Sequence, residues 1–463
     1  MTTALVSTSA RLVLTHRARG ARVLAALLLL AGTPLGLAAQ DTTRTALPAG
    51  GLITLQDAIR IALAQNSVVR FGRNSLTLDS LTVRQSRNAF LPNLSASSSS
   101  SQSILNGSGG NPFSASVGLS SGITIYNGGQ NRNILSQARV NAQATGEALG
   151  RTRQSVAFAV ASDYLALITQ QEQLRVQQEN LTAQEQELTQ LEQFVKQGTR
   201  PIGDLYQEQA SVASTRLALV NAQRGTEVAK VNLIQELVLD PRLDYTFATP
   251  TDTATGPLPR FNLDSLISVA FQQRVDLRAQ TLRVQAAQTE IKIAEGGRLP
   301  QVTGSAGYGT GYNSSSDGGF ATQLNQRRGG SVGVSVSVPI LDRGAVSIAK
   351  QRAQIQLDNE LLTLRDQEQA VALDVRRAYL DYISAGEQLS AADAQQRAAA
   401  LALQAAQARY RVGLATFVEV TLARATLIQA QSAVVSARSS LVFQRALMSY
   451  YTGVLDPASV RLD

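Results

Sequence analysis

The residues best suited to act on solutes are two carboxylates, Asp204 and Glu419. Each lies six positions after a glycine, Gly198 or Gly413. A carboxylate near the start of a helix is often only a favourable partner of the helix dipole. If several copies of the chain meet around one opening, however, the same groups would form a ring of negative charge that favours cations. The sequence leaves both interpretations open.

Two short motifs have the spacing of catalytic sites, but their surroundings argue against catalysis. Residues 118–122 match G-x-S-x-G and residues 347–350 match S-x-x-K. The chain has no cysteine, and its single histidine, His16, lies in a segment predicted to be removed. Without these side chains the mature protein cannot form a Ser-His-Asp triad, a Cys-His pair, or a thiolate or imidazole zinc site. We therefore expect no enzyme activity, cofactor or bound metal.

Residues 1–39 have the composition of a secretory signal peptide. Four arginines precede or flank an apolar run at 23–30, and a small-residue stretch ends at Ala39. Removing residues 1–39 lowers the formal charge of the chain from +8 to about +4. The remaining charge is dispersed rather than gathered in Lys/Arg runs, so we expect no nucleic-acid binding. Residues 40–51 form an N-terminal extension without an assigned role.

The rest of the chain is an internal duplication, with two halves of about 200 residues. Ile125-Tyr126-Asn127-Gly128-Gly129 corresponds to Ile340-Leu341-Asp342-Arg343-Gly344 at an offset of 215, which also relates Gly198 to Gly413 and Asp204 to Glu419. We assign the first repeat to 52–240, a linker to 241–261, the second repeat to 262–453 and a tail to 454–463.

Each repeat is predicted to run helix, two strands, long helix, glycine turn, helix. The first helices are expected at 55–90 and 262–298, the long helices at 129–197 and 345–412, and the turns at 197–203 and 412–418. Leucines at 167, 174, 181 and 188 form a heptad row typical of coiled coils. At 1.5 Å per residue, each long helix would reach roughly 100 Å. Two half-length helices stacked end to end would match one long helix, which suggests four helical wall elements per chain.

The segments at about 93–126 and 301–340 change to a period of two, with apolar residues such as Val332, Val334 and Val336 alternating with serine and glycine. Strands of about ten residues with one apolar face fit the wall of an outer-membrane barrel. No apolar run reaches the roughly 20 residues of a membrane-spanning helix. Open strand edges in lipid would leave backbone groups unsatisfied, so other copies must complete the barrel. Whether three or four copies do so is left open.

The predicted fold is therefore mainly α with a small antiparallel β part: a long α-helical coiled-coil barrel plus a transmembrane β-barrel completed by oligomerisation. This repeated order resembles the TolC family of outer-membrane efflux proteins over about residues 52–453. The resemblance rests on the Leu-Pro helix ends at 91–92 and 299–300, the two strand exits compared above, and the turns Gln197-Gly198-Thr199 and Val412-Gly413-Leu414.

The resemblance implies a homotrimer with a barrel in the outer membrane and a helical tunnel in the periplasm. It also implies roles for individual residues: a periplasmic tip that docks an adaptor (Gly198, Thr199, Val412, Gly413, Leu414) and an aperture constriction (Asp204, Tyr410, Glu419). Leu422 stands where the family often has a further carboxylate.

We therefore expect a passive exit duct in a tripartite efflux or type I secretion system, in contact with outer-membrane lipid, a periplasmic adaptor and an inner-membrane pump. The alternative is a periplasmic coiled-coil scaffold or binding protein without a pore. Neither the cargo nor the identity of the pump follows from the sequence.

Overall fold

The structure is a computed structural model that describes residues 52–102, 112–249 and 260–457. The predicted signal peptide (1–39) and N-terminal extension (40–51) lie outside the described residues, as do 250–259 of the linker and 458–463 of the tail. All described residues belong to one unit of the chain, Gly50–Asp463.

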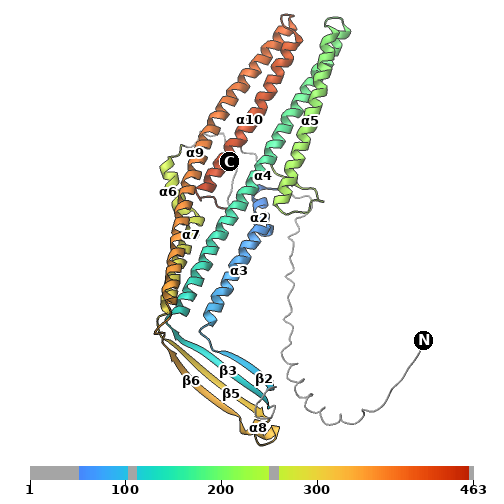
Figure 1. Cartoon of the computed structure of the whole chain (residues 1–463). Helices are drawn as coiled ribbons and strands as arrows, with labels where there is room; N and C mark the ends of the chain where they lie inside the picture. Colours follow the sequence, from blue (N-terminus) through green and yellow to red (C-terminus); the bar gives the residue numbers. More distant parts are fainter. Residues whose placement is uncertain (1–51, 103–111, 250–259, 458–463) are drawn as a thin grey trace, which may run out of the picture. The chain divides into compact units, whose positions relative to one another are not determined.

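Helices make up most of this unit, as the sequence predicts. The first half contains α2 (Leu55–Gln65), α3 (Ser67–Asn88), α4 (Gln130–Lys196) and α5 (Ile202–Glu236). The second half contains α6 (Leu263–Gln273), α7 (Val275–Gly296), α9 (Ala345–Arg411) and α10 (Phe417–Tyr451). The two long helices, α4 and α9, have 67 residues each. Each folds back through a tight turn, so α4–α5 and α9–α10 form two hairpins whose turns lie at the end opposite the sheet (Figure 1).

The expectation of one continuous first helix in each repeat is wrong. The structure divides it at Asn66, between α2 and α3, and at Arg274, between α6 and α7. Asn66 has ψ 130°, outside the helical range, and its side chain accepts a hydrogen bond of 2.8 Å from the Val68 N–H. Asparagine is well suited to cap a new helix in this way. Because no proline or glycine stands at either break, hydrophobic periodicity alone does not reveal them.

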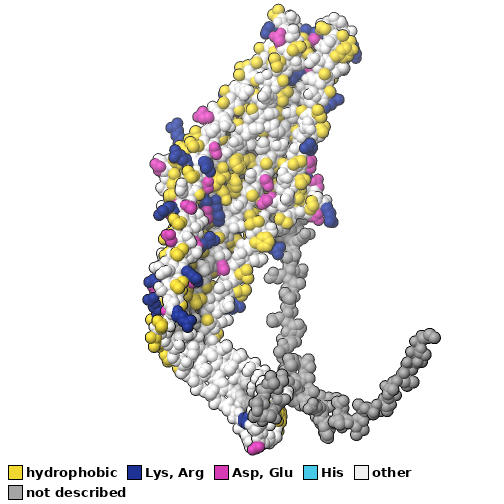
Figure 2. All heavy atoms as spheres, in the orientation of Figure 1, with side chains coloured by type: hydrophobic (Ala, Val, Ile, Leu, Met, Phe, Trp, Pro, Cys, Tyr) yellow, Lys and Arg dark blue, Asp and Glu magenta, His cyan; other side chains and the backbone are white. Residues whose placement is uncertain are grey.

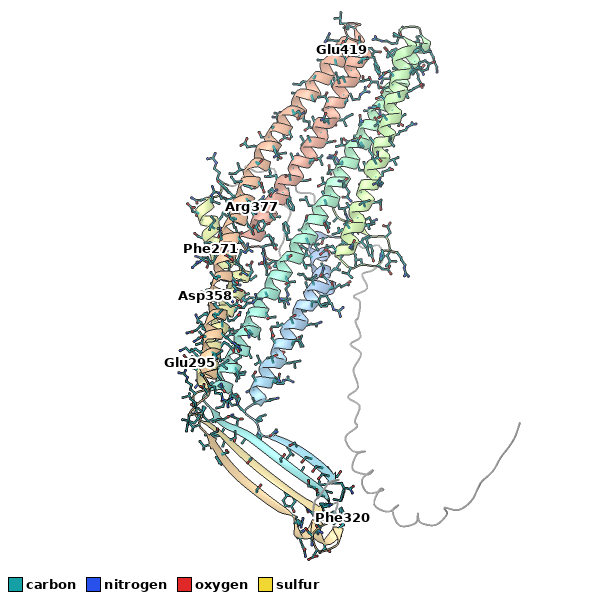
Figure 3. All side chains as sticks on the ribbon, viewed as in Figure 1. Phe271, Glu295, Phe320, Asp358, Arg377 and Glu419 are labelled. Carbon is teal, nitrogen blue, oxygen red and sulfur yellow. The ribbon has the colours of Figure 1, made fainter. Side chains whose placement is uncertain are left out.

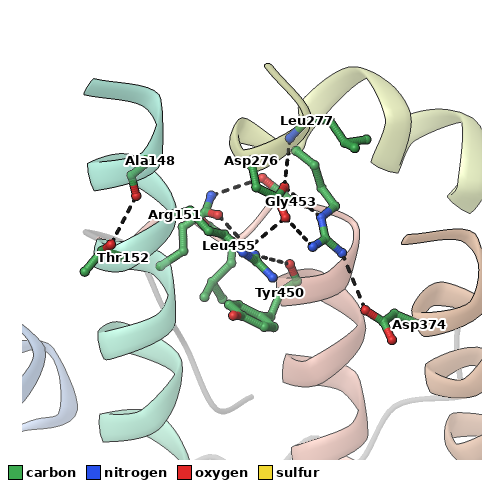
Figure 4. Close-up of polar contacts among 11 residues, drawn as sticks. Ala148, Arg151, Thr152, Asp276, Leu277, Asp374, Tyr450, Gly453 and Leu455 are labelled. Carbon is green, nitrogen blue, oxygen red and sulfur yellow. Dashed lines mark hydrogen bonds and ion pairs between the residues drawn. The ribbon is translucent and has the colours of Figure 1, made fainter. Parts of the chain in front are cut away.

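The second break is held by a buried arginine, Arg274, whose partners Asp276 and Asp374 are labelled in Figure 4. The Arg274 guanidinium lies 2.5 Å from a carboxylate oxygen of Asp276 and 3.9 Å from one of Asp374 in α9. Beside Arg274, the Arg151 guanidinium of α4 donates a hydrogen bond of 3.2 Å to the Tyr450 carbonyl. The same guanidinium lies 3.8 Å from the centre of the Tyr450 ring. Charged groups from α4, α7 and α9 and the Tyr450 carbonyl of α10 therefore meet where the half-length helices join.

The sheet has four antiparallel strands in the order β2 (Asn93–Gln102), β3 (Phe113–Asn127), β5 (Gln301–Asn313) and β6 (Gly329–Ser337). A short helix, α8 (Phe320–Gln326), lies between β5 and β6. Strand β6 ends three residues before the predicted boundary at 340. Pro339 follows closely, and proline has no N–H to donate to a strand partner. A separate parallel pair joins β1 (Leu52–Ile53) to β4 (Thr246–Phe247).

The two faces of the four-stranded sheet differ in chemistry. On one face, serine hydroxyls pair across β2 and β3 at 2.8 Å (Ser95–Ser120) and 2.7 Å (Ser99–Ser116). The view in Figure 2 shows the sheet almost free of charged and hydrophobic side chains. The opposite face carries the apolar residues of the strands, and Val332 and Val334 of β6 are 89% and 67% exposed. The sheet therefore has a small, hydroxyl-rich face and an apolar face whose side chains on β6 are exposed.

The duplication is also visible in the backbone conformation. Residues with positive φ recur in pairs at the offset of 215: Gly128 with Arg343, Gly129 with Gly344, Gly198 with Gly413, and Val238 with Gly453. These positions are helix and strand ends, where a left-handed residue terminates one element and redirects the chain. The repeat is thus conserved between the halves at its turns even where the residue types differ.

The packing between elements places α4 at the centre. It contacts α2, α3, α5, α7 and α10, while α9 packs on α6, α7 and α10. Tyr164 of α4 is buried, and its hydroxyl donates to the carbonyl of Ala248 at 2.5 Å.

Over the part of the chain that the structure describes, no helix is both long enough and apolar enough to cross a membrane.

Candidate functional site

The two glycine turns close their hairpins with the same geometry. Gly198 has φ 72° and Gly413 has φ 77°. In the first turn the Thr199 N–H donates to the Phe194 carbonyl at 2.9 Å, and in the second the Leu414 N–H donates to the Arg409 carbonyl at 2.9 Å. These are the hydrogen bonds of a helix C-terminus closed by a left-handed residue. Thr199, Val412 and Leu414 are exposed beside them.

Glu419 caps the start of α10. Its carboxylate accepts a hydrogen bond of 3.1 Å from the Thr416 N–H, while the Thr416 hydroxyl accepts one from the Glu419 N–H, a reciprocal capping box. The hydrogen bond from the Thr416 N–H, together with Arg409 at 3.4 Å, lowers the pKa of the Glu419 carboxyl. The side chain is exposed at the turn end of the molecule (Figure 3). It can therefore stabilise the helix and still present negative charge to solvent.

Asp204 lies in the first turn of α5 and contacts the other hairpin. The Tyr410 hydroxyl, near the end of α9, donates a hydrogen bond of 2.6 Å to the Asp204 carboxylate. Burial, and then this hydrogen bond, raise the pKa of Tyr410, so the phenol stays protonated and remains a donor. The structure thus brings together two of the three predicted aperture residues, Asp204 and Tyr410, while Glu419 pairs with Arg409 instead.

Arg200 strengthens the same junction and was missed by sequence reasoning. Its guanidinium donates to the Tyr410 carbonyl at 2.8 Å and to the Arg411 carbonyl at 3.2 Å. It also lies 4.1 Å from the centre of the Tyr410 ring, a cation–π distance. The last carbonyls of α9 lack the usual partner four residues further along a helix. The Tyr410 carbonyl accepts the Gly413 N–H at 3.0 Å, and Arg200 from the other hairpin adds a further donor. The signal in the sequence was an arginine directly after a glycine turn.

A second junction lies deeper between the hairpins. Arg424 of α10 donates to both carboxylate oxygens of Glu208 in α5, at 3.1 and 3.2 Å, and also pairs with Glu187 of α4. Glu208 is completely buried. This burial raises the pKa of the Glu208 carboxyl to about 7. One guanidinium therefore serves two carboxylates from the opposite hairpin.

The hairpins leave a cavity of about 950 Å³ that reaches from the turn junction at Arg200 and Tyr410 past Arg424. Its lining includes apolar and aromatic side chains from both sides, among them Leu191, Phe194, Leu427 and Phe417. Phe417 is buried, with its ring centre 5.4 Å from that of Tyr410. The hairpins are thus joined by discrete contacts and are not packed tightly along their whole length.

The two motifs with catalytic spacing fall in structural elements. Residues 118–122 lie in the middle of β3, and Lys350 of the S-x-x-K motif forms an ion pair of 2.8 Å with Glu295 on the surface. Within the described ranges, no three His, Cys, Asp or Glu side chains are grouped closely enough to hold a metal ion.

Comparison with known proteins agrees with the duplicated fold. The outer membrane efflux protein family matches residues 58–237 and 266–453, one match for each repeat. Among curated proteins, the pyoverdine export outer membrane protein OpmQ of Pseudomonas putida is 26% identical over 326 residues, which cover 69% of this chain and 66% of the relative. The outer membrane protein TolC of Vibrio cholerae is 26% identical over 331 residues, 70% of this chain and 74% of the relative.

A solved structure shows the same fold. The outer membrane protein VceC of Vibrio cholerae superposes with a TM-score of 0.72 at 18% sequence identity, covering 86% of this chain and 96% of that one. The two repeats, the two hairpins and the four-stranded sheet are therefore the architecture of a known outer-membrane protein. The chain belongs to the outer membrane efflux protein family, the outer-membrane channels of bacterial efflux and secretion.

Proposed function

We propose that three copies of the chain assemble into a passive exit duct, with the sheets in the outer membrane and the helical hairpins extending into the periplasm. Energy would come from an inner-membrane pump joined through a periplasmic adaptor. The observation that carries this proposal is the sheet: one face is apolar and exposed apart from the end that α8 covers, and in the described residues neither outer edge, β2 or β6, has a strand partner. Such edges are unfavourable in lipid until neighbouring copies pair with them.

The helices offer a matching surface for neighbouring copies. The exposed side of α5 carries apolar residues in an approximate heptad register, with Leu217 64%, Val220 58% and Val231 58% exposed. The uncovered side of α9 presents Leu380 and Leu401, which are 56% and 66% exposed. Because α5 and α9 are the two outermost hairpin helices, we propose that α5 of one copy packs against α9 of the next.

Closure of the duct would depend on the contacts between hairpins near the turns. The Tyr410–Asp204 hydrogen bond and the Arg200 contacts tie α9 to the α4–α5 hairpin in this structure. Opening would separate these groups while Gly198 and Gly413 keep each turn intact. Thr199, Val412 and Leu414, which are exposed at the turns, are the proposed docking residues for the adaptor.

Selectivity at the aperture is proposed to rest on Glu419, with Asp204 as a second contributor. Glu419 is exposed, and its lowered pKa keeps it charged, whereas Asp204 is half-buried and bound to Tyr410. In planar bilayers the reversal potential in a salt gradient should shift away from cation preference in Glu419→Gln and in the double variant with Asp204→Asn. Glu185→Gln, an exposed carboxylate away from the turns, is the control. Unchanged reversal potentials in the double variant would overturn this assignment.

The assembly itself is tested by membrane fractionation and by the mass of the detergent-extracted particle. A three-chain particle from the outer membrane supports the duct. A water-soluble particle would instead support the scaffold without a pore that the sequence left as its alternative.

A further inference from the structure

The short helix α8 packs on the apolar face of the sheet. The Thr310 hydroxyl of β5 donates to the Leu324 carbonyl in α8 at 2.6 Å, and the rings of Tyr312 and Phe320 lie 5.1 Å apart. In the strand register Thr310 is paired with Val117 and Tyr312 with Ala115, so these residues share the face that carries the uncovered apolar side chains. Helix α8 therefore covers part of the apolar face, at the end of the sheet farthest from the helical hairpins (Figure 1).

The position of α8 is fixed by one buried side chain. Gln323 is 2% exposed, and its amide nitrogen lies 2.9 to 3.0 Å from the carbonyl oxygens of Asn313, Ser316 and Gly318, which share its two N–H donors. Its amide oxygen accepts from the Asn313 N–H at 2.9 Å. A buried amide with this many partners holds a connection in a single arrangement. Helix α8 is thus a built surface element at the strand end.

Aromatic side chains continue from the sheet onto α8. The ring of Phe113 in β3 lies 6.3 Å from Tyr312, which in turn contacts Phe320. Phe320 is 56% exposed, and Tyr308, four residues before Tyr312 on the same face of β5, is also 56% exposed. An exposed aromatic cluster at one end of an apolar sheet face is typical of the boundary between hydrocarbon and lipid headgroups.

The charged residues of the strand regions lie at the α8 end of the sheet. The stretches 93–127 and 301–341 contain only three charged residues: Asp317, Arg327 and Arg328. The two arginines directly follow α8 and are exposed, and Arg327 donates to the Ser316 hydroxyl at 2.6 Å. Arginine is well matched to phosphate because its planar guanidinium can donate two parallel hydrogen bonds.

We propose that α8 with Phe113, Tyr312 and Phe320 forms a lipid-facing surface at the outer boundary of the membrane, and that Arg327 and Arg328 bind the phosphate groups of anionic lipids there. This inference rests on the proposed function, because it requires the sheet to lie in a membrane. The apolar face enters the hydrocarbon, the aromatic cluster marks its limit, and the paired arginines reach the headgroups just beyond it.

The depth of α8 can be measured directly because the chain contains no tryptophan. Phe320→Trp introduces a single tryptophan on α8, and Phe271→Trp places one on α6 in the helical part (Figure 3). In vesicles containing brominated phosphatidylcholine, Phe320→Trp should be quenched most by bromines near the headgroup end of the acyl chain. Phe271→Trp should not be quenched at any bromine position.

A third variant separates the inference from the proposed function. Val334→Trp lies in the middle of β6 on the apolar face. Quenching of Val334→Trp without quenching of Phe320→Trp would leave the sheet in the bilayer and overturn the role of α8. If neither variant is quenched, the sheet does not enter the membrane and the proposed function fails as well.

Lipid selectivity tests the arginines. The detergent-solubilised protein is titrated with phosphatidylglycerol or phosphatidylcholine, and bound lipid is counted by native mass spectrometry. A basic side chain at an anionic membrane surface strengthens binding roughly fivefold. Arg327→Gln with Arg328→Gln should therefore reduce phosphatidylglycerol binding by at least about tenfold. The matched control is Arg376→Gln with Arg377→Gln, another adjacent pair of exposed arginines, on α9.

Equal phosphatidylglycerol binding by the wild type and the Arg327/Arg328 variant would overturn the headgroup assignment. Competition by inorganic phosphate at the same concentration as the lipid would also overturn it, because the arginines would then form a free-phosphate site rather than a lipid surface.

Discussion

The Tyr410 hydroxyl and the Asp204 carboxylate, 206 residues apart in the sequence, form a hydrogen bond of 2.6 Å between the two hairpins. The Tyr410 ring also makes a cation–π contact with the Arg200 guanidinium and packs against the ring of Phe417. A single hydroxyl is therefore the only part of Tyr410 that needs to be removed to break the contact with Asp204.

We expect Tyr410→Phe to shift the duct toward its open state, because the ring contacts remain and only the hydrogen bond is lost. A hydrogen bond to a charged group contributes about 1.5–3 kcal/mol, so the open population should rise by about tenfold or more. Single-channel recordings in planar bilayers measure this change as the fraction of time that the channel is open. Tyr206→Phe, which removes a hydroxyl from an exposed tyrosine of α5, should leave the open population unchanged. An unaltered Tyr410→Phe channel would mean that this contact does not control opening.

Arg424→Met should destabilise the hairpin pair strongly. It leaves Glu208 buried without its partner, and breaking a buried pair from one side costs about 3–5 kcal/mol. Replacing both residues, as Glu208→Gln with Arg424→Met, should recover much of that loss. The free energy of unfolding from urea titration in detergent is the measurement. Arg216→Gln, which breaks an exposed ion pair with Glu185, should cost less than about 1 kcal/mol. Equal losses for Arg424→Met and Arg216→Gln would contradict the importance of burial.

Stability should depend on pH through Glu208. Burial raises its pKa to about 7 from an ordinary value of 4.5, so the folded protein binds this proton more tightly than the unfolded chain. The contribution to stability is therefore complete below about pH 4.5 and is lost as the pH rises through about 7. The difference in unfolding free energy between the wild type and Glu208→Gln should change across this window. A constant difference from pH 4.5 to 7 would show that Glu208 does not titrate there.

Val238 and Gly453 make a paired test of the duplicated turns. Both have positive φ, 56° and 77°, but valine is strained in this conformation. Val238→Gly should stabilise the protein by about 1 kcal/mol. Gly453→Val should destabilise it by more, because a Cβ at this position would lie only 3.0 Å from the backbone of Arg274. Thermal unfolding of both variants in detergent measures the effects. A loss of stability in Val238→Gly would show that the valine side chain contributes more than its strain costs.

Much of this architecture could be predicted from residue patterns. Heptad rows in α4 and the alternation in β6 reflect local periodicity, which is independent of distant partners. The breaks at Asn66 and Arg274 could not be predicted in the same way, since the pattern continues through them and the reason for the second break lies in Asp276, Asp374 and the adjoining helices.

The candidate site was predicted only in part for the same physical reason. Glycine turns at 198 and 413 follow from local chain geometry, and so does a carboxylate near the start of a helix. The partners Arg200 and Arg424 act on groups in the opposite repeat, more than 200 residues away. Periodicity identifies which side of a helix is apolar, but it does not specify which charge from another helix will meet it.

The paired serines of β2 and β3 have a consequence for anything that passes beside this face of the sheet. Ser95–Ser120, Ser99–Ser116 and Ser101–Ser114 each share a proton that either hydroxyl can donate. By rotating, such hydroxyls can offer a donor or an acceptor to a neighbouring molecule. A cation, an anion and a neutral solute would each find partners comparable to those of bulk water. This face therefore offers hydrogen-bond partners to solutes of either charge. Under the proposed function, discrimination among solutes would fall to the charged turns at the other end of the chain.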